Sequence, residues 1–129
     1  IIIVADHGRD VAYLDSMVFD DLGIDATYVN PVLMVKDFNS SGETVFSEEF
    51  MTNADTPTLA VDGLIDNPTN PFTGNPINSD AKFAGDQHII FSPVWKTTEN
   101  NGNTFLPGYW YSVHDAIDSR DNWTYLGEY

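Results

Sequence analysis

The chain has 129 residues, a formal net charge of −15 and no cysteine. Five Lys and Arg against twenty Asp and Glu are too few cations to bind nucleic acid or an anionic membrane surface. Without cysteine, this stretch holds no disulfide, thiolate metal ligand or cysteine nucleophile. No apolar run is long enough to cross a bilayer, so we expect no membrane contact. Three Trp, six Tyr and eight Phe indicate a folded domain rather than disorder.

The first predicted element is a strand over residues 1–5. Ile1 to Val4 are all β-branched and show no polar alternation, which is typical of a strand buried on both faces of a parallel sheet. We expect this strand to lie inside a larger open α/β sheet whose earlier strands precede it. The alternative is an N-terminal strand of a small mixed sheet. If its edge is open, we expect self-association through it, since unpaired edges recruit other chains.

The next segments predict a helix or broken helix over 9–23, then a strand over 32–38. Pro31 sets the start of that strand. A turn over 39–42 and a short return strand over 43–46 follow.

The strongest helix signal covers residues 56–64. Thr56 can cap it, Pro57 suits its first position and Gly63 suits its end. We expect Leu59, Ala60 and Leu64 to face the core.

Proline and glycine between 67 and 78 predict a surface loop. Strands are predicted over 87–96, 109–113 and 122–126. The pattern as a whole indicates an α/β fold, or α+β for the chain alone, that ends in a small antiparallel meander with one or two helices.

Asp6, His7 and Gly8 follow the first strand directly. Ligands of open α/β sheets bind beyond the carboxyl ends of the strands, and a turn there lets adjacent side chains reach one ion. A carboxylate with an imidazole suits zinc or manganese, and Gly8 leaves room for an ion or a substrate. The alternative is an acidic turn with an exposed histidine.

Several segments together resemble the sulfatase/alkaline-phosphatase superfamily, across nearly the whole chain. Val-Ala-Asp-His-Gly at 4–8 resembles its late metal-ligand motif, and Asp55 to Ala60 is similar to its Asp-x-x-Pro-Thr helix. Further segments similar to the family's following strand, loop and closing part are 30–36, 70–76, 110–115 and 122–125. The nearest branch is the membrane-anchored one, with lipoteichoic-acid synthases and phosphoglycerol or phosphoethanolamine transferases.

The resemblance implies that residues 1–129 are one C-terminal fragment of a larger catalytic domain, beginning at the end of an alkaline-phosphatase-like sheet. It implies that Asp6 and His7 bind one divalent metal (Mn, Zn, Ca or Mg). It further implies an N-terminal remainder as partner, carrying the Thr, Ser or modified Cys nucleophile, and a sulfate or phosphate ester as substrate. The parent would be anchored on the extracellular face of a bacterial plasma membrane. The fragment alone would be inactive, since it has no recognisable nucleophile motif.

Two other interpretations remain open at this point. The first is a carbohydrate-binding module of a bacterial surface protein, and the second is a structural module. Aromatic residues that could stack on sugars are Trp95, Tyr109, Trp110, Tyr111 and Trp123. At strand spacing such residues more often belong to a core or a sheet face, and His88 and His114 more often have a structural role.

Overall fold

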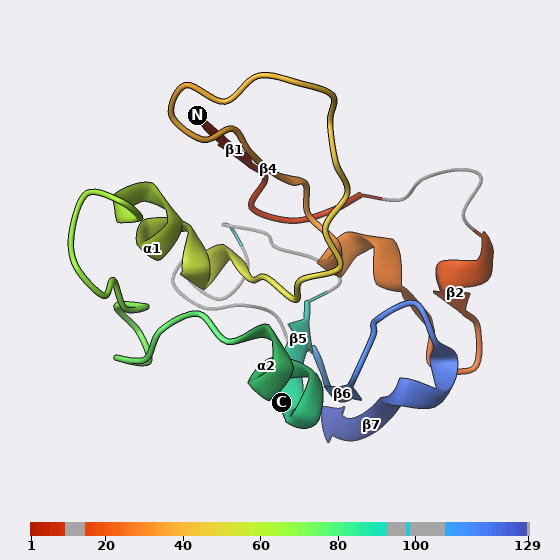
Figure 1. Ribbon diagram of the computed structural model, residues 1–129. Coiled ribbons are helices and arrows are strands. Elements are labelled where there is room, and N and C mark those ends of the chain that lie inside the picture. Colours follow the sequence, from red (N-terminus) through yellow and green to blue (C-terminus); the bar gives the residue numbers. More distant parts are fainter. Residues whose placement is uncertain (10–14, 93–97, 99–107, 129) are drawn as a thin grey trace.

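A computed structural model describes residues 1–9, 15–92, 98 and 108–128. Its regular elements form a mixed α+β arrangement in which all strand pairings are antiparallel (Figure 1). The strands are β1 (Ile2–Val4), β2 (Val18–Phe19), β3 (Ile24–Asp25), β4 (Leu33–Val35), β5 (Asp86–Phe91), β6 (Tyr109–His114) and β7 (Trp123–Glu128). The α-helices are α1 (Thr56–Val61) and α2 (Ser79–Ala84), and the 3-10 turns are η1 (Asp15–Met17), η2 (Ala26–Val29), η3 (Asn53–Asp55) and η5 (Arg120–Asn122). Among the described residues, no helix has the length and apolarity needed to cross a membrane.

The predicted C-terminal antiparallel meander is confirmed. Strands β5, β6 and β7 pair in that order, with Ile89 opposite Tyr111 and Val113 opposite Trp123. Residues 93–96 of the predicted 87–96 strand lie outside the described residues. Alternation in β6 places Tyr111 and Val113 on the face that builds the core.

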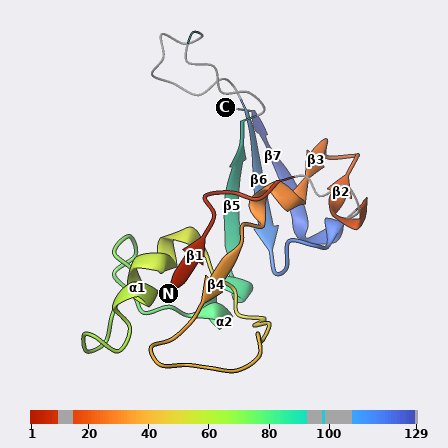
Figure 2. The same cartoon turned by 90° about the horizontal axis from the view of Figure 1, so that it is seen from above.

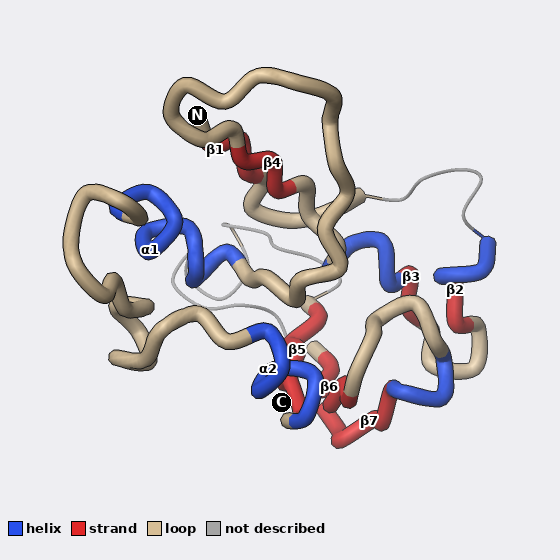
Figure 3. Tube along the Cα trace, viewed as in Figure 1, coloured by secondary structure: helices blue, strands red, loops and turns tan. Residues whose placement is uncertain are grey.

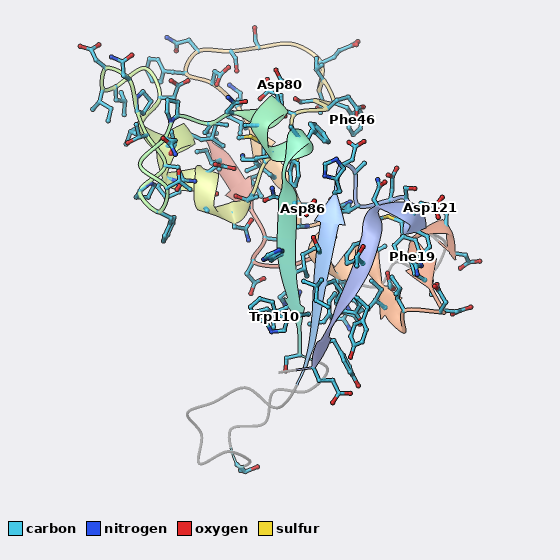
Figure 4. The ribbon with its side chains drawn as sticks, turned by 90° about the horizontal axis from the view of Figure 1, so that it is seen from below. Phe19, Phe46, Asp80, Asp86, Trp110 and Asp121 are labelled. Atoms are coloured by element: carbon cyan, nitrogen blue, oxygen red, sulfur yellow. The ribbon has the colours of Figure 1, made fainter. Side chains whose placement is uncertain are left out.

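The hydrophobic core lies between this sheet and the β2–β3 hairpin (Figure 2). Phe19 meets Trp123 edge to face at 5.8 Å, and the Tyr111 ring lies 5.9 Å from the same indole. Figure 4 shows Phe19 reaching from β2 toward β7. The Tyr111 hydroxyl donates to the Leu22 carbonyl oxygen at 2.9 Å, so the hairpin is also tied to the sheet by a polar contact. The buried apolar residues are Met17, Phe19, Ile24, Ala26, Tyr111, Val113 and Trp123.

The predicted helix over 9–23 is wrong in its described part. After η1 the chain forms a short hairpin whose turn ends at Gly23, with a φ of 67°. Burial there follows a period of two, since Met17 and Phe19 are buried while Val18 between them is exposed. The two large buried side chains, Met17 and Phe19, therefore lie on one face of an extended segment, as in a strand and not as in a helix. Residues 10–14 lie outside the described part of the chain.

The sheet of β1 and β4 differs from the expected doubly buried parallel sheet. The two strands pair antiparallel, with Ile3 opposite Met34. No other layer of the described chain covers them fully, because Ile1 is 79% exposed and Ile3 and Met34 are about half exposed. The outer edge of β1 bears no strand of the described chain. Self-association through this edge stays a prediction.

The strand predicted over 32–38 is shorter than expected, and the return strand over 43–46 is absent from the structure. That segment is an extended loop on which Phe46 is 92% exposed (Figure 3). Figure 4 places Phe46 near the α2 end of the molecule. Because no strand of the described chain pairs with this loop, its backbone N–H and C=O groups form no ladder and are hydrogen-bonded by solvent.

Helix α1 is confirmed, but of the three residues predicted to face the core only Leu59 is half-buried. The helix begins at Thr56 itself, and the preceding turn is closed by Thr52 and Asp55 instead of a Thr56 cap. Thr58 faces inward, whereas Ala60 is exposed and Leu64, beyond the helix, is 79% exposed. Gly63 follows with a φ of 71°, as expected of a glycine that ends a helix.

Helix α2 was not predicted, although its ends carry ordinary signals. The Asn78 side chain caps it by accepting from the Ala81 backbone N–H at 2.9 Å, and Gly85 follows its last residue. With six residues, its pattern was too short to distinguish from the preceding loop.

The two helices are joined through the buried carboxylate of Asp55, which is 1% exposed. It accepts from the Lys82 ammonium at 2.5 Å, from the Thr52 backbone N–H at 2.8 Å and from the Asn70 amide at 3.0 Å. Burial raises the pKa of Asp55, but the hydrogen bonds from Lys82, Thr52 and Asn70 outweigh it and the net pKa is lowered. The ionised form of the Asp55 carboxylate therefore stabilises the folded protein.

Replacing Asp55 with Asn should lower the free energy of unfolding by about 3 kcal/mol at neutral pH, because Lys82 would keep a half-buried charge without its partner. The lowered pKa gives the sign of the pH effect. The stabilisation is complete above about pH 4, the unfolded value, and is lost as the pH falls through the lower folded pKa. Denaturant unfolding from pH 7 to 2 measures this. Asp62→Asn, at an exposed carboxylate beside α1, is the control. Equal losses in both variants would contradict the role of the network.

Candidate metal centre

Asp6 and His7 lie where the chain leaves β1. The last ladder bond joins the Ala5 N–H to the Val32 carbonyl oxygen at 2.9 Å, after which the chain turns. Both side chains are open to solvent, with exposed fractions of 90% for Asp6 and 68% for His7. The turn releases both residues from strand alternation, as the sequence predicted, and leaves both groups accessible to a ligand.

The backbone of this turn is held by a residue from a distant part of the chain. The Asn53 amide nitrogen donates to the carbonyl oxygens of Ala5 at 3.0 Å and Asp6 at 2.9 Å. Asn53 opens the η3 turn that also contains Asp55. The turn η3 therefore connects the hydrogen bonds around Asp55 to the backbone of the candidate site.

Gly8 holds the other side of the turn, for a different reason than expected. Its N–H donates to the Tyr28 carbonyl oxygen at 2.8 Å. A Cβ atom at Gly8 would collide with the Thr27 carbonyl oxygen and would come within 2.9 Å of that of Asn30. The space left by the missing side chain is thus filled by the backbone of η2, and not by an ion or a substrate.

The imidazole of His7 is oriented by its own neighbour. Nδ1 lies 2.6 Å from the Gly8 carbonyl oxygen, which can only accept, so Nδ1 carries the proton and donates. Nε2, the other ring nitrogen, lies 3.8 Å from Oδ1 of Asp6. The same carboxylate oxygen accepts from the His7 backbone N–H at 3.0 Å.

Nε2 of His7 and Oδ1 of Asp6 are 3.8 Å apart. Ligand nitrogen and oxygen atoms lie about 2.1 Å from zinc, so two ligands of one tetrahedral ion are about 3.4 Å apart. The two side chains would have to draw closer to share such an ion. A carbonyl that fixes the other ring nitrogen is the usual second partner of a metal-bound histidine.

The pair is an incomplete ligand set. In the part of the chain that the structure describes, no group of three or more Asp, Glu, His or Cys side chains is arranged to hold a metal ion. Two ligands from one turn would need others from elsewhere, because structural and catalytic zinc sites use three or four protein ligands.

The remaining histidines are not brought to this site. His114 pairs with Asp86 across β5 and β6, with Nδ1 3.0 Å from the carboxylate oxygen, and both side chains are exposed. The His88 ring packs 6.3 Å from that of Trp110. Both histidines belong to the C-terminal meander.

Two of the five aromatic residues considered for sugar stacking are interior. Tyr111 and Trp123 are core residues, while the Tyr109 and Tyr125 rings are tilted by 56° and offer no common flat face. Trp95 lies outside the described residues. Tyr111 and Trp123, two of the five candidates, are therefore not accessible to a sugar.

A hollow of about 460 Å³ adjoins Asp6. The end of β1 and the outer side of α1 line it, and Phe72 from the following loop completes it. Sequence reasoning missed both this hollow and Asn53, because each depends on contacts between residues about 50 positions apart.

Comparison of the chain with protein-family models, with curated proteins and with solved structures finds no match.

Replacing Gly8 with Ala should destabilise the protein by about 1–3 kcal/mol, since the new methyl group meets fixed backbone rather than a movable side chain. Gly85→Ala is the matched control, because a Cβ there would lie 3.3 Å from its nearest neighbour, the Ala81 carbonyl oxygen. Denaturant midpoints of both variants provide the comparison. A Gly8→Ala protein as stable as Gly85→Ala would disprove the tight contact with η2.

Proposed function

We propose that this chain is the C-terminal portion of a metal-dependent enzyme that hydrolyses or transfers sulfate or phosphate esters. In this proposal Asp6 and His7 are two ligands of one divalent cation (Mn, Zn, Ca or Mg). The observation that carries it is the proximity of the two exposed side chains, with the imidazole Nε2 of His7 3.8 Å from a carboxylate oxygen of Asp6 and Nδ1 oriented by the Gly8 carbonyl oxygen.

The chemistry of the pair suits this reaction class. When bound, a divalent cation polarises a phosphoryl or sulfuryl oxygen and lowers the pKa of a nucleophile. Asp6 contributes negative charge to the cation, while His7 contributes a neutral nitrogen whose tautomer the Gly8 carbonyl fixes. A chain with a net charge of −15 would otherwise repel an anionic ester, so the cation also supplies the missing attraction.

The uncovered sheet supports a larger catalytic body. Ile1, Ile3 and Met34 form an apolar surface beside the candidate site, and contiguous exposed apolar groups of this kind mark interaction surfaces. We propose that an N-terminal remainder supplies the other ligands and the nucleophile, and that the sheet is the end of an alkaline-phosphatase-like sheet. By the sequence resemblance, that enzyme acts on the extracellular face of a bacterial plasma membrane.

The test is turnover of a sulfate or phosphate ester by the polypeptide that joins this chain to its catalytic remainder. Asp6→Ala and His7→Ala should each reduce turnover at least about a hundredfold, because each removes a ligand of the cation. Asp86→Ala and His114→Ala, at the other exposed acid–imidazole pair, should leave turnover unchanged. Tryptophan fluorescence verifies folding, since Trp123 lies in the core. Near-normal turnover in both ligand variants would refute the proposal.

A further inference from the structure

We propose that Lys82 and Asn70 become joined by an amide bond between Nζ and Cγ, formed within the folded chain with Asp55 as the catalytic base. None of these three residues belongs to the Asp6–His7 pair, so the bond is independent of the proposed function.

The nucleophile, the base and the electrophile of such a reaction lie together in the structure. Nζ of Lys82 donates to Oδ2 of Asp55 at 2.5 Å, and Nδ2 of Asn70 donates to Oδ1 of the same carboxylate at 3.0 Å. The amine and the carboxamide are thus bound to the two oxygens of one carboxylate. The side chain of Lys82 is 18% exposed, and Asp55 and Asn70 are buried, so little water competes for these groups.

The Asn70 carboxamide is polarised and held in place. Its Oδ1 accepts from the backbone N–H groups of Phe72 at 2.8 Å and Thr73 at 3.3 Å. Two N–H groups at an acyl oxygen form an oxyanion hole, which stabilises the charge of a tetrahedral intermediate. The backbone of Asn70 is fixed as well, because its N–H donates to the Asn75 carbonyl oxygen and its own carbonyl oxygen accepts from Gly74, both at 2.8 Å.

The hydrogen bonds already present give each proton a route. Asp55 takes a proton from the Lys82 ammonium, which leaves a neutral amine beside a carboxylic acid. Nζ attacks Cγ of Asn70, and negative charge collects on Oδ1. Asp55 gives its proton to Nδ2, the Cγ–Nδ2 bond breaks, and the departing ammonia takes the surplus proton of Nζ. One ammonium group and one carboxamide thereby become one secondary amide and one ammonium ion, without oxidant, reductant or cofactor.

The ion pair makes this reaction slow. Burial raises the pKa of Asp55, but the hydrogen bonds from Lys82, Thr52 and Asn70 lower it further, so the charged pair predominates. The reaction need occur only once in each chain, and well-oriented groups held in contact can react as if at concentrations of about 10⁵ M or more. A rare neutral pair is therefore sufficient over the lifetime of the folded protein.

The bond would strengthen a part of the chain that has little apolar packing. None of the buried core residues lies between positions 50 and 82, and without cysteine the chain forms no disulfide. The amide would join α2 covalently to the loop after α1. Asp55 would continue to accept from Thr52 and would accept from the new amide N–H in place of the ammonium.

The experiment is intact-mass spectrometry of the purified full chain after prolonged incubation at slightly alkaline pH, which favours the neutral amine. We expect the wild-type chain to weigh less than its sequence by one ammonia, and a protease digest to contain a branched peptide that joins position 70 to position 82. Lys82→Arg keeps a cation beside Asp55 but should retain the full sequence mass. Lys36→Arg, at an exposed lysine that donates to the Ser40 carbonyl oxygen, should still lose ammonia.

A folded wild-type chain that keeps its full sequence mass would overturn the amide bond, with tryptophan fluorescence confirming the fold. Loss of ammonia that persists in Lys82→Arg would overturn it too, because the loss would then come from cyclisation of an asparagine elsewhere. Neither outcome depends on a metal or on turnover, so both leave the proposed function to its own test.

Discussion

The buried charge of Asp55 is the constraint on which residues 50–82 and the turn after β1 depend. A carboxylate with 1% exposure must be fully hydrogen-bonded, and its partners come from the preceding turn, the loop after α1 and the helix α2. Lys82 also donates to the Phe50 carbonyl oxygen, so its side chain joins α2 to residues 50–55. Asn53 lies in the same turn as Asp55. The network therefore also positions the Asn53 amide, which donates to the carbonyl oxygens of Ala5 and Asp6.

Two parts of the structure are stabilised in different ways. The C-terminal meander and the β2–β3 hairpin bury a shared aromatic core, as Phe19, Tyr111 and Trp123 show. The β1–β4 sheet has no comparable cover among the described residues, and its order comes from backbone bonds and the polar network. A two-stranded sheet is marginal in water by itself. Because this side is uncovered, we propose that the ligands needed beside Asp6 and His7 come from a body that packs there.

Local signals in the sequence were sufficient for some elements. The strand segments over 87–96, 109–113 and 122–126 predicted the meander, and Pro57 with Gly63 predicted α1. The hairpin at Gly23 was misread because its apolar residues also fit a helical spacing, and only packing against Trp123 decides between them. The adjacency of Asp6 and His7 was evident from the sequence. The Gly8 contact with η2 and the hydrogen bonds from the Asn53 amide to Ala5 and Asp6 are tertiary interactions. No local pattern encodes them.

The most direct measurement is a titration of the full chain with Mn²⁺, followed by NMR of its three imidazoles. Paramagnetic broadening falls steeply with distance from the ion, so each ring reports its own site. The account predicts that His7 broadens at the lowest Mn²⁺ concentration, that Asp6→Ala removes this effect, and that His88 and His114 respond only later. Broadening of His114 before His7, or of all three rings together, would contradict a shared cation at Asp6 and His7.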